Sequence, residues 1–119
     1  MFEKELKRKR RHYYIRKKVI GTEEIPRLNI RRSLANLHVQ LVDDINEKTI
    51  ISASTIGKEF RQKYGYGGNV KAAEFLGEIF AGKMKDKGIE RICFDRGGYR
   101  YHGRVKAFAD KLRNNKIKF

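Results

Sequence analysis

Between residues 27 and 54, apolar and polar residues alternate along the chain. A period of two places one kind of residue on each face of a β-strand. The alternation is interrupted at residues 33–36 and 43–48, where tight turns are expected. The pattern predicts an antiparallel meander of three strands, the last over residues 49–54, with one apolar face. The apolar positions of the first two strands are Leu28, Ile30, Leu37, Val39 and Leu41.

After residue 69 the apolar period lengthens to that of an α-helix. Asn69 is a good N-cap and Gly88 suits the position that follows the C-terminus, so these two residues bound the predicted helix. A short helical turn is expected before it, within residues 58–64. The apolar stripe of the long helix consists of Val70, Ala73, Leu76, Ile79, Phe80 and Met84.

The last third of the chain repeats the change of period. Residues 90–94 (ERICF) end in the apolar triplet ICF, which predicts a short buried strand. A helix follows and ends at Asn114 and Asn115, and residues 117–119 alternate once more, as in a short edge strand. The apolar face of this second helix consists of Val105, Phe108, Ala109 and Leu112.

The predicted order of elements is therefore β-β-β-α-β-α-β. A strand, a helix and a strand in succession imply a right-handed parallel crossover. We expect an α/β (α+β) fold, in which a three-stranded antiparallel meander plus a parallel β-α-β unit form one mixed β-sheet. Two helices pack on this sheet, and a flexible basic N-terminal arm precedes it.

The charge of the chain points to a polyanionic partner. In 119 residues, 29 Lys and Arg oppose 14 Asp and Glu, which gives a net charge of +15. Such self-repulsion destabilises a monomer unless a polyanion neutralises it, and nucleic acid is the commonest such partner. No apolar run approaches the roughly 20 residues of a membrane-spanning helix, and no signal peptide is recognisable, so we expect a cytoplasmic protein without a membrane partner.

Almost half of that charge lies in residues 1–18, where nine Lys and Arg face two Glu for a local balance of +7. Such a segment is expected to be disordered, or to become helical only when phosphates neutralise it. His12, Tyr13 and Tyr14 add aromatic faces suited to RNA, although a nonspecific solubilising tail is the alternative. We expect two units, a basic RNA-binding arm over residues 1–22 and a single RNA-binding domain over residues 23–119.

The run DRGGYRYHGRVKA, at residues 95–107, sets four cations, two tyrosines and a histidine among three glycines. It leaves a predicted strand and opens a predicted helix. Glycines let a backbone approach a ligand closely, helix starts favour anions, and arginines grip phosphate with two hydrogen bonds. Tyr99 and Tyr101 add rings that can stack on bases or riboses. A phosphate backbone is the ligand that this loop suggests, and a solvated turn is the alternative.

The polar face of the meander leaves two interpretations open. It offers Arg27, Asn29, Arg31, His38 and Gln40, either as a platform for RNA or as the hydrated side of a sheet. Cys93 lies within an apolar triplet, where a buried small side chain is expected rather than a nucleophile.

An enzymatic alternative is a metal-dependent nuclease of the ribonuclease-H-like kind, with Asp43, Asp44 and Asp95 as metal ligands. Two metal ions need several carboxylates that converge on one place. Asp43 and Asp44 are adjacent, and adjacent residues of a strand point to opposite faces. His102 has no partner at a spacing typical of catalysis, and the few cysteines and histidines exclude a zinc finger. We therefore expect no enzyme, no catalytic residue, no metal, no cofactor and no small-molecule substrate.

Several stretches together resemble one family. They are PRLNIRRS, VQLVDD, ASTIGKE and the run from GNVKAAEF to NNKIKF, which includes the highly specific DRGGYRYHGRVKA. These resemble the ribosomal protein L18 family, the bacterial large-subunit proteins that bind 5S rRNA. The resemblance implies a structural protein that helps attach 5S rRNA to 23S rRNA in the central protuberance, beside neighbouring large-subunit ribosomal proteins. Besides the nuclease, a nonspecific polyanion binder is the other alternative to this ribosomal function.

The resemblance also implies where RNA is bound: on the arm, at the end of the first strand, and on the loop over residues 96–104. The chain departs from the family pattern at Arg31, at residues 34–36 and at His38, where the family has an aromatic or aliphatic residue, an Asn-Lys-His run and an aromatic residue. The residues expected to contact RNA are Lys7, Arg8, Lys9, Arg10, Arg11, His12, Tyr13, Arg16, Lys17, Lys18, Arg27, Arg31, Arg32, Ser33, Arg96, Tyr99, Arg100, Tyr101, His102 and Arg104.

Overall fold

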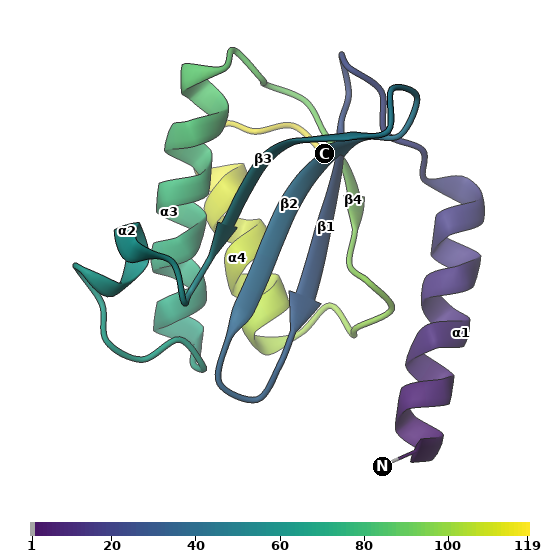
Figure 1. Cartoon of the computed structure of the whole chain (residues 1–119), viewed down its shortest axis with the longest axis horizontal. Coiled ribbons are helices and arrows are strands. Elements are labelled where there is room, and N and C mark those ends of the chain that lie inside the picture. Colours follow the sequence, from purple (N-terminus) through teal and green to yellow (C-terminus); the bar gives the residue numbers. More distant parts are fainter. Residues whose placement is uncertain (1) are drawn as a thin grey trace.

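The computed structural model describes residues 2–119, apart from the side chains of Phe2, Lys17 and Lys18. A four-stranded sheet carries two long helices on one side, while a further helix stands apart near β4 (Figure 1). The elements in order are α1 (Phe2–Lys18), β1 (Arg27–Arg32), β2 (Leu37–Asp43), β3 (Lys48–Ser54), α2 (Lys58–Arg61), α3 (Val70–Asp86), β4 (Cys93–Asp95) and α4 (Gly103–Asn114).

The sheet is mixed, as the sequence predicts. Its strand order is β3-β2-β1-β4, with antiparallel pairs among β1, β2 and β3 and a parallel pair between β1 and β4. Leu28 lies opposite Leu41, and Asn29 lies opposite Gln40. This register gathers the apolar residues of the meander on the face that α3 and α4 cover (Figure 1) and the polar residues on the other face.

The core lies between the sheet and the two long helices. Leu28, Leu41 and Phe80 are fully buried, and the rings of Phe80 and Phe108 lie 5.9 Å apart between α3 and α4. Gly77 allows the two helices to approach, because a Cβ at this position would lie 2.9 Å from the Cβ of Lys111. Complete burial of large apolar side chains supplies most of the driving force for such a fold.

The long helix α3 begins and ends where its capping residues predict. The Asn69 side chain accepts a hydrogen bond of 2.8 Å from the Ala72 amide, and Gly88 follows the helix with a φ of +72°. The apolar stripe is confirmed from Ala73 to Met84, but the inclusion of Val70 is wrong. Val70 is 44% exposed because it lies in the first turn, beyond the region that the sheet covers.

The end of the chain departs from the prediction of a final strand. Only one parallel bridge forms there, between Arg91 and Lys118, so the seventh element of the predicted order is not a strand. Ile117 is nevertheless buried, so its apolar side chain completes the core without a ladder around it. Cys93 is only half-buried, and its sulfur faces the carbonyl groups of the linker between α1 and β1.

The N-terminal segment also differs from expectation, because it forms the regular helix α1 instead of a disordered arm. Lys, Arg and Glu are all good helix formers, and acidic residues at Glu3 and Glu5 suit the first turn. Glu3 also pairs with Lys7 one turn later at 3.8 Å. Contacts with the rest of the chain then fix the direction of the helix. None of the helices in residues 2–119 is long and apolar enough to cross a membrane.

Candidate nucleic-acid interface

Three basic segments that are far apart in sequence meet at one end of the sheet. They are α1, the loop over residues 96–104, which includes the start of α4, and the β1–β2 turn with the end of β1, over residues 31–36. Arg104 donates hydrogen bonds to the carbonyl oxygens of Ser33 at 2.8 Å and Asn36 at 3.3 Å. The Tyr99 hydroxyl donates to the Arg32 carbonyl at 3.1 Å. The loop and the turn therefore form one continuous surface.

Helix α1 lies directly on the same loop. Arg8 donates to the Gly97 carbonyl at 2.9 Å, and Arg11 donates to the Gly98 carbonyl at 2.7 Å. Gly98 has a φ of +82°, and a Cβ there would meet the backbone carbonyl of Arg8 and the amide of His12. Glycine is needed at this position for both its conformation and its size.

The two tyrosines of the loop are used within the fold. The Tyr99 ring is only 8% exposed, and the guanidinium carbons of Arg8 and Arg32 lie 4.8 and 4.9 Å from its centroid. The Tyr101 hydroxyl bonds to Asp110 at 3.1 Å, and burial, with this bond, raises the pKa of Tyr101. Tyr99 therefore holds arginines in place through cation–π contacts instead of presenting a free ring to a base.

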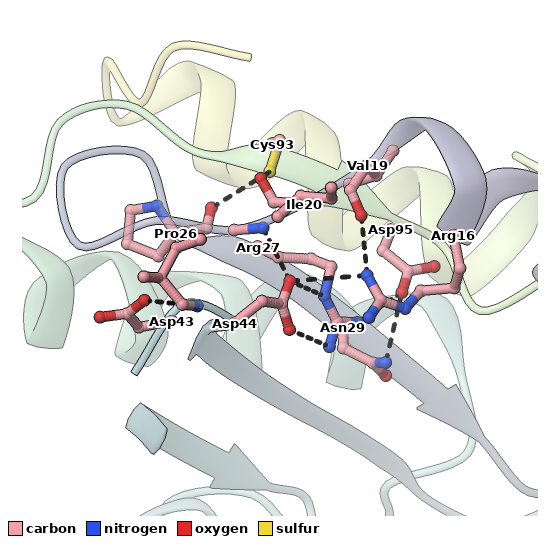
Figure 2. Close-up of polar contacts among 12 residues, drawn as sticks. Arg16, Val19, Ile20, Pro26, Arg27, Asn29, Asp43, Asp44, Cys93 and Asp95 are labelled. Carbon is pink, nitrogen blue, oxygen red and sulfur yellow. Dashed lines mark hydrogen bonds and ion pairs between the residues drawn. The ribbon is translucent and has the colours of Figure 1, made fainter. Parts of the chain in front are cut away.

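Asp95 is the fully buried centre of the contacts beneath α1 (Figure 2). It accepts hydrogen bonds from Arg27 at 2.6 Å, from the amide of Gly97 at 2.9 Å and from Asn29 at 3.4 Å. His12 of α1 completes the set, with its Nε2 atom 3.0 Å from Asp95 Oδ2. One carboxylate thus joins α1, β1 and the loop.

Asp44, at the end of β2, makes the second set of contacts (Figure 2). Arg27 binds both of its oxygens, at 3.0 and 3.1 Å, and the amide of Gly21 donates at 2.7 Å. Arg16 of α1 lies 3.5 Å away and also donates to the Val19 carbonyl at 2.7 Å. Burial alone would raise the pKa of Asp44, but the bonds from Arg27 and Gly21 outweigh it, so this pKa is lowered.

The structure divides the residues expected to contact RNA into two groups. One group faces the protein: Arg8, His12, Arg16, Arg27, Tyr99 and Arg104 all make internal polar contacts, and Arg27 is 7% exposed. Arg96 and Tyr101 are half-buried. Arg11 and Arg32 also make internal contacts, with Gly98 and with the Tyr99 ring, but remain exposed. The second group, the exposed set, consists of Lys7, Lys9, Arg10, Arg11, Tyr13, Arg31, Arg32, Ser33, Arg100 and His102. The side chains of Lys17 and Lys18 lie outside the described residues.

The polar face of the sheet carries a shallow hollow beside β3. Asn29, Arg31, His38 and Gln40 line it, as the strand pattern suggests, and Lys83 of α3 also reaches it. His38 bonds to Ser54 at 2.9 Å, and burial together with Arg31 lowers its pKa. Sequence reasoning missed the lysine, because no local pattern shows that α3 passes this edge.

The carboxylates proposed for a nuclease are engaged in structural contacts. Asp43 accepts from the amides of Ile45 and Asn46 at 3.0 and 3.2 Å, which closes the turn after β2. Asp44 and Asp95 both bind Arg27. Within residues 2–119, no group of three or more His, Cys, Asp and Glu residues is placed to hold a metal ion. The carboxylates therefore stabilise the fold.

Comparison with known proteins identifies the family of this chain. Residues 2–119 match the family model described as ribosomal L18 of archaea, bacteria, mitochondria and chloroplasts. The large ribosomal subunit protein uL18 of Aquifex aeolicus is 49% identical over 115 residues, which cover 95% of this chain and 93% of the relative. The uL18 of Ruminiclostridium cellulolyticum is 47% identical, over 94% of this chain and 92% of the relative. The uL18 of Clostridium kluyveri is 44% identical, over 99% and 97%. The chain belongs to the ribosomal L18 family, so the expectation of a structural ribosomal protein that is not an enzyme is confirmed.

Proposed function

We propose that this chain is a component of the large ribosomal subunit that binds 5S rRNA through the exposed set and helps attach it to 23S rRNA in the central protuberance. The match of residues 2–119 to the ribosomal L18 family carries this proposal. Neighbouring large-subunit proteins complete its surroundings. The arm over residues 1–22 and the domain over residues 23–119 serve as the two parts of one RNA-binding surface.

The chemistry of the exposed set supports a phosphate ligand. Lys9 and Arg10 are exposed on α1, and Arg32 and Arg100 are exposed at the turn and in the loop that meet it. The loop and turn are joined by hydrogen bonds, so these cations keep fixed positions relative to each other. A rigid array of cations favours one RNA shape over others, whereas charge on a mobile tail does not.

The test is a gel-shift titration with 5S rRNA at physiological salt, with a length-matched unrelated RNA as competitor. The wild-type protein should bind 5S rRNA at nanomolar concentration and keep it in the presence of the competitor. Loss of 5S rRNA to an equal amount of competitor would show a nonspecific polyanion binder and would refute the proposal.

The double variant Lys9→Gln/Arg10→Gln tests the role of α1. If each residue neutralises one phosphate, the slope of log K against log salt becomes shallower by roughly 1.4 to 1.8. The matched control is Lys63→Gln/Lys71→Gln, which removes the same charge from exposed positions near α2 and α3, across the sheet from α1 (Figure 1). An equal change of slope in both variants would mean that only net charge matters.

A further inference from the structure

Two acidic side chains lie beneath α1, the helix that carries part of the basic surface proposed to bind RNA. Asp95 is fully buried, and the Asp44 side chain is 18% exposed. In a protein of net charge +15 that binds a polyanion, acids at this place oppose binding by simple Coulomb repulsion. Their presence calls for a role that outweighs that repulsion.

The two acids make similar contacts, and Figure 2 shows their shared partner Arg27 and the contact between Asp44 and Arg16. Each binds Arg27 of β1 from inside the protein, and each also meets one side chain of α1. Asp95 meets His12, and Asp44 meets Arg16, one helical turn further along. The two acids therefore hold the same face of α1 at two successive turns.

The rest of that face is held by the loop. Arg8, one turn before His12, donates to the Gly97 carbonyl, and the Asp95 carboxylate in turn accepts from the Gly97 amide. Residues 8, 12 and 16 thus form a docking face, and each of the three makes a polar contact within the protein. Arg10 lies about 160° around the helix from His12 at 100° per residue, so docking this face directs Arg10 outward.

We propose that Asp44 and Asp95 are positioning residues for RNA binding, which anchor α1 so that Lys9 and Arg10 are presented to the RNA backbone. This proposal rests on the proposed function. The acids do not touch RNA, and they act through Arg27, His12 and Arg16. Holding the cations in one place removes the loss of conformational freedom that a mobile arm suffers on binding.

The sign of one effect separates this role from plain electrostatics. Removing a negative charge from a cationic protein strengthens RNA binding if only net charge matters. The positioning role predicts the opposite: Asp95→Asn and Asp44→Asn each weaken 5S rRNA binding tenfold or more. Asp86→Asn, at an exposed acid in the last turn of α3, is the matched control and should leave binding unchanged or slightly stronger.

The salt dependence separates positioning from general damage to the fold. If α1 no longer presents its cations, fewer phosphates are contacted, and the slope of log K against log salt becomes shallower in Asp95→Asn. A smaller fraction of folded protein would lower the affinity without changing that slope. In the Lys9→Gln/Arg10→Gln background, the effect of Asp95→Asn should shrink, because the cations that it positions are already absent.

A variant on the α1 side keeps the proposal testable if Asp95→Asn does not fold. His12→Ala leaves the pairs between Arg27 and both acids intact and should likewise weaken binding with a shallower slope. Wild-type affinity and slope in both Asp95→Asn and His12→Ala, or wild-type binding by His12→Ala where Asp95→Asn does not fold, would overturn the proposal. Failure of the wild-type protein to prefer 5S rRNA would instead overturn the proposed function.

Discussion

Gly98→Ala tests the packing of α1 on the loop, and the chain offers a close control in Gly88→Ala. Both glycines have positive φ angles, +82° at Gly98 and +72° at Gly88. A Cβ at Gly98 would collide with the backbone of α1 at Arg8 and His12, whereas a Cβ at Gly88 would meet nothing within 4 Å. The two substitutions therefore share the backbone strain and differ in the collision.

The loss of stability that the two substitutions share is small. An L-residue in the left-handed region costs about 1–2 kcal/mol, and the lower entropy of the unfolded alanine chain offsets about 0.4–1 kcal/mol of it. Gly88→Ala should therefore lower the free energy of unfolding by about 1 kcal/mol. In a chain of this size that corresponds to a fall of roughly 3–6 °C in the midpoint of thermal unfolding.

Gly98→Ala should have a larger effect because α1 must move away. The movement breaks the bonds from Arg8 and Arg11 to the loop and the contact between His12 and Asp95. At about 0.5–1.5 kcal/mol for each hydrogen bond, these three add roughly 2–4 kcal/mol to the loss. The affinity for 5S rRNA should fall at least tenfold in Gly98→Ala and stay unchanged in Gly88→Ala.

Urea unfolding at neutral pH and the gel-shift titration together measure both effects. Equal losses of stability in the two variants, with equal RNA affinity, would refute the packing of α1 on Gly98. A loss of stability limited to Gly98→Ala with unchanged RNA affinity would show that α1 docks but does not contribute to RNA binding.

Two further predictions concern the domain itself. Asn69→Ala removes the bond from the Ala72 amide at the start of α3 and should lower the free energy of unfolding by about 1 kcal/mol, measured by urea unfolding. The pKa of Asp44 is lowered in the folded protein, so its contribution to stability is present above the unfolded pKa, about 3.9, and is lost as the pH falls through the folded pKa. The stability difference between wild type and Asp44→Asn should therefore be large at pH 7 and shrink below about pH 4, and a constant difference would contradict this linkage.

The sheet and the two long helices could be predicted because their signals are local. Leu28 and Ile30 alternate with polar residues, and the cap at Asn69 is separated from its partner amide by three residues. The prediction of a final strand was wrong because its signal is not local: the pairing of Lys118 depends on how Arg91 lies in space. Burial of Ile117 satisfies the apolar signal there without a strand.

The helical state and docking of α1 could not be derived from local charge. The segment was expected to repel itself, but the contacts that hold it join residues 28 to 89 positions apart, such as Arg16 with Asp44 and Arg8 with Gly97. Because such contacts join residues that are far apart in sequence, sequence alone could not divide the candidate residues into exposed and internal ones. Arg27 reads as a residue of the polar face, yet the two acids on either side of it bury it.

The way α1 is attached also determines how salt experiments on this protein should be interpreted. Leu6 is 47% exposed and Tyr13 60%, so α1 has little apolar surface in contact with the domain and depends on polar contacts for its position. Interactions between exposed charges are largely screened beyond about 8 Å at physiological salt, whereas pairs with a buried acid are screened much less. Because Asp95 is fully buried, the docking of α1 should persist over the range of salt in which phosphate contacts weaken. The slope of log K against log salt then counts phosphates contacted by a fixed array of cations, and a slope that becomes shallower at high salt would reveal that α1 itself is leaving the domain.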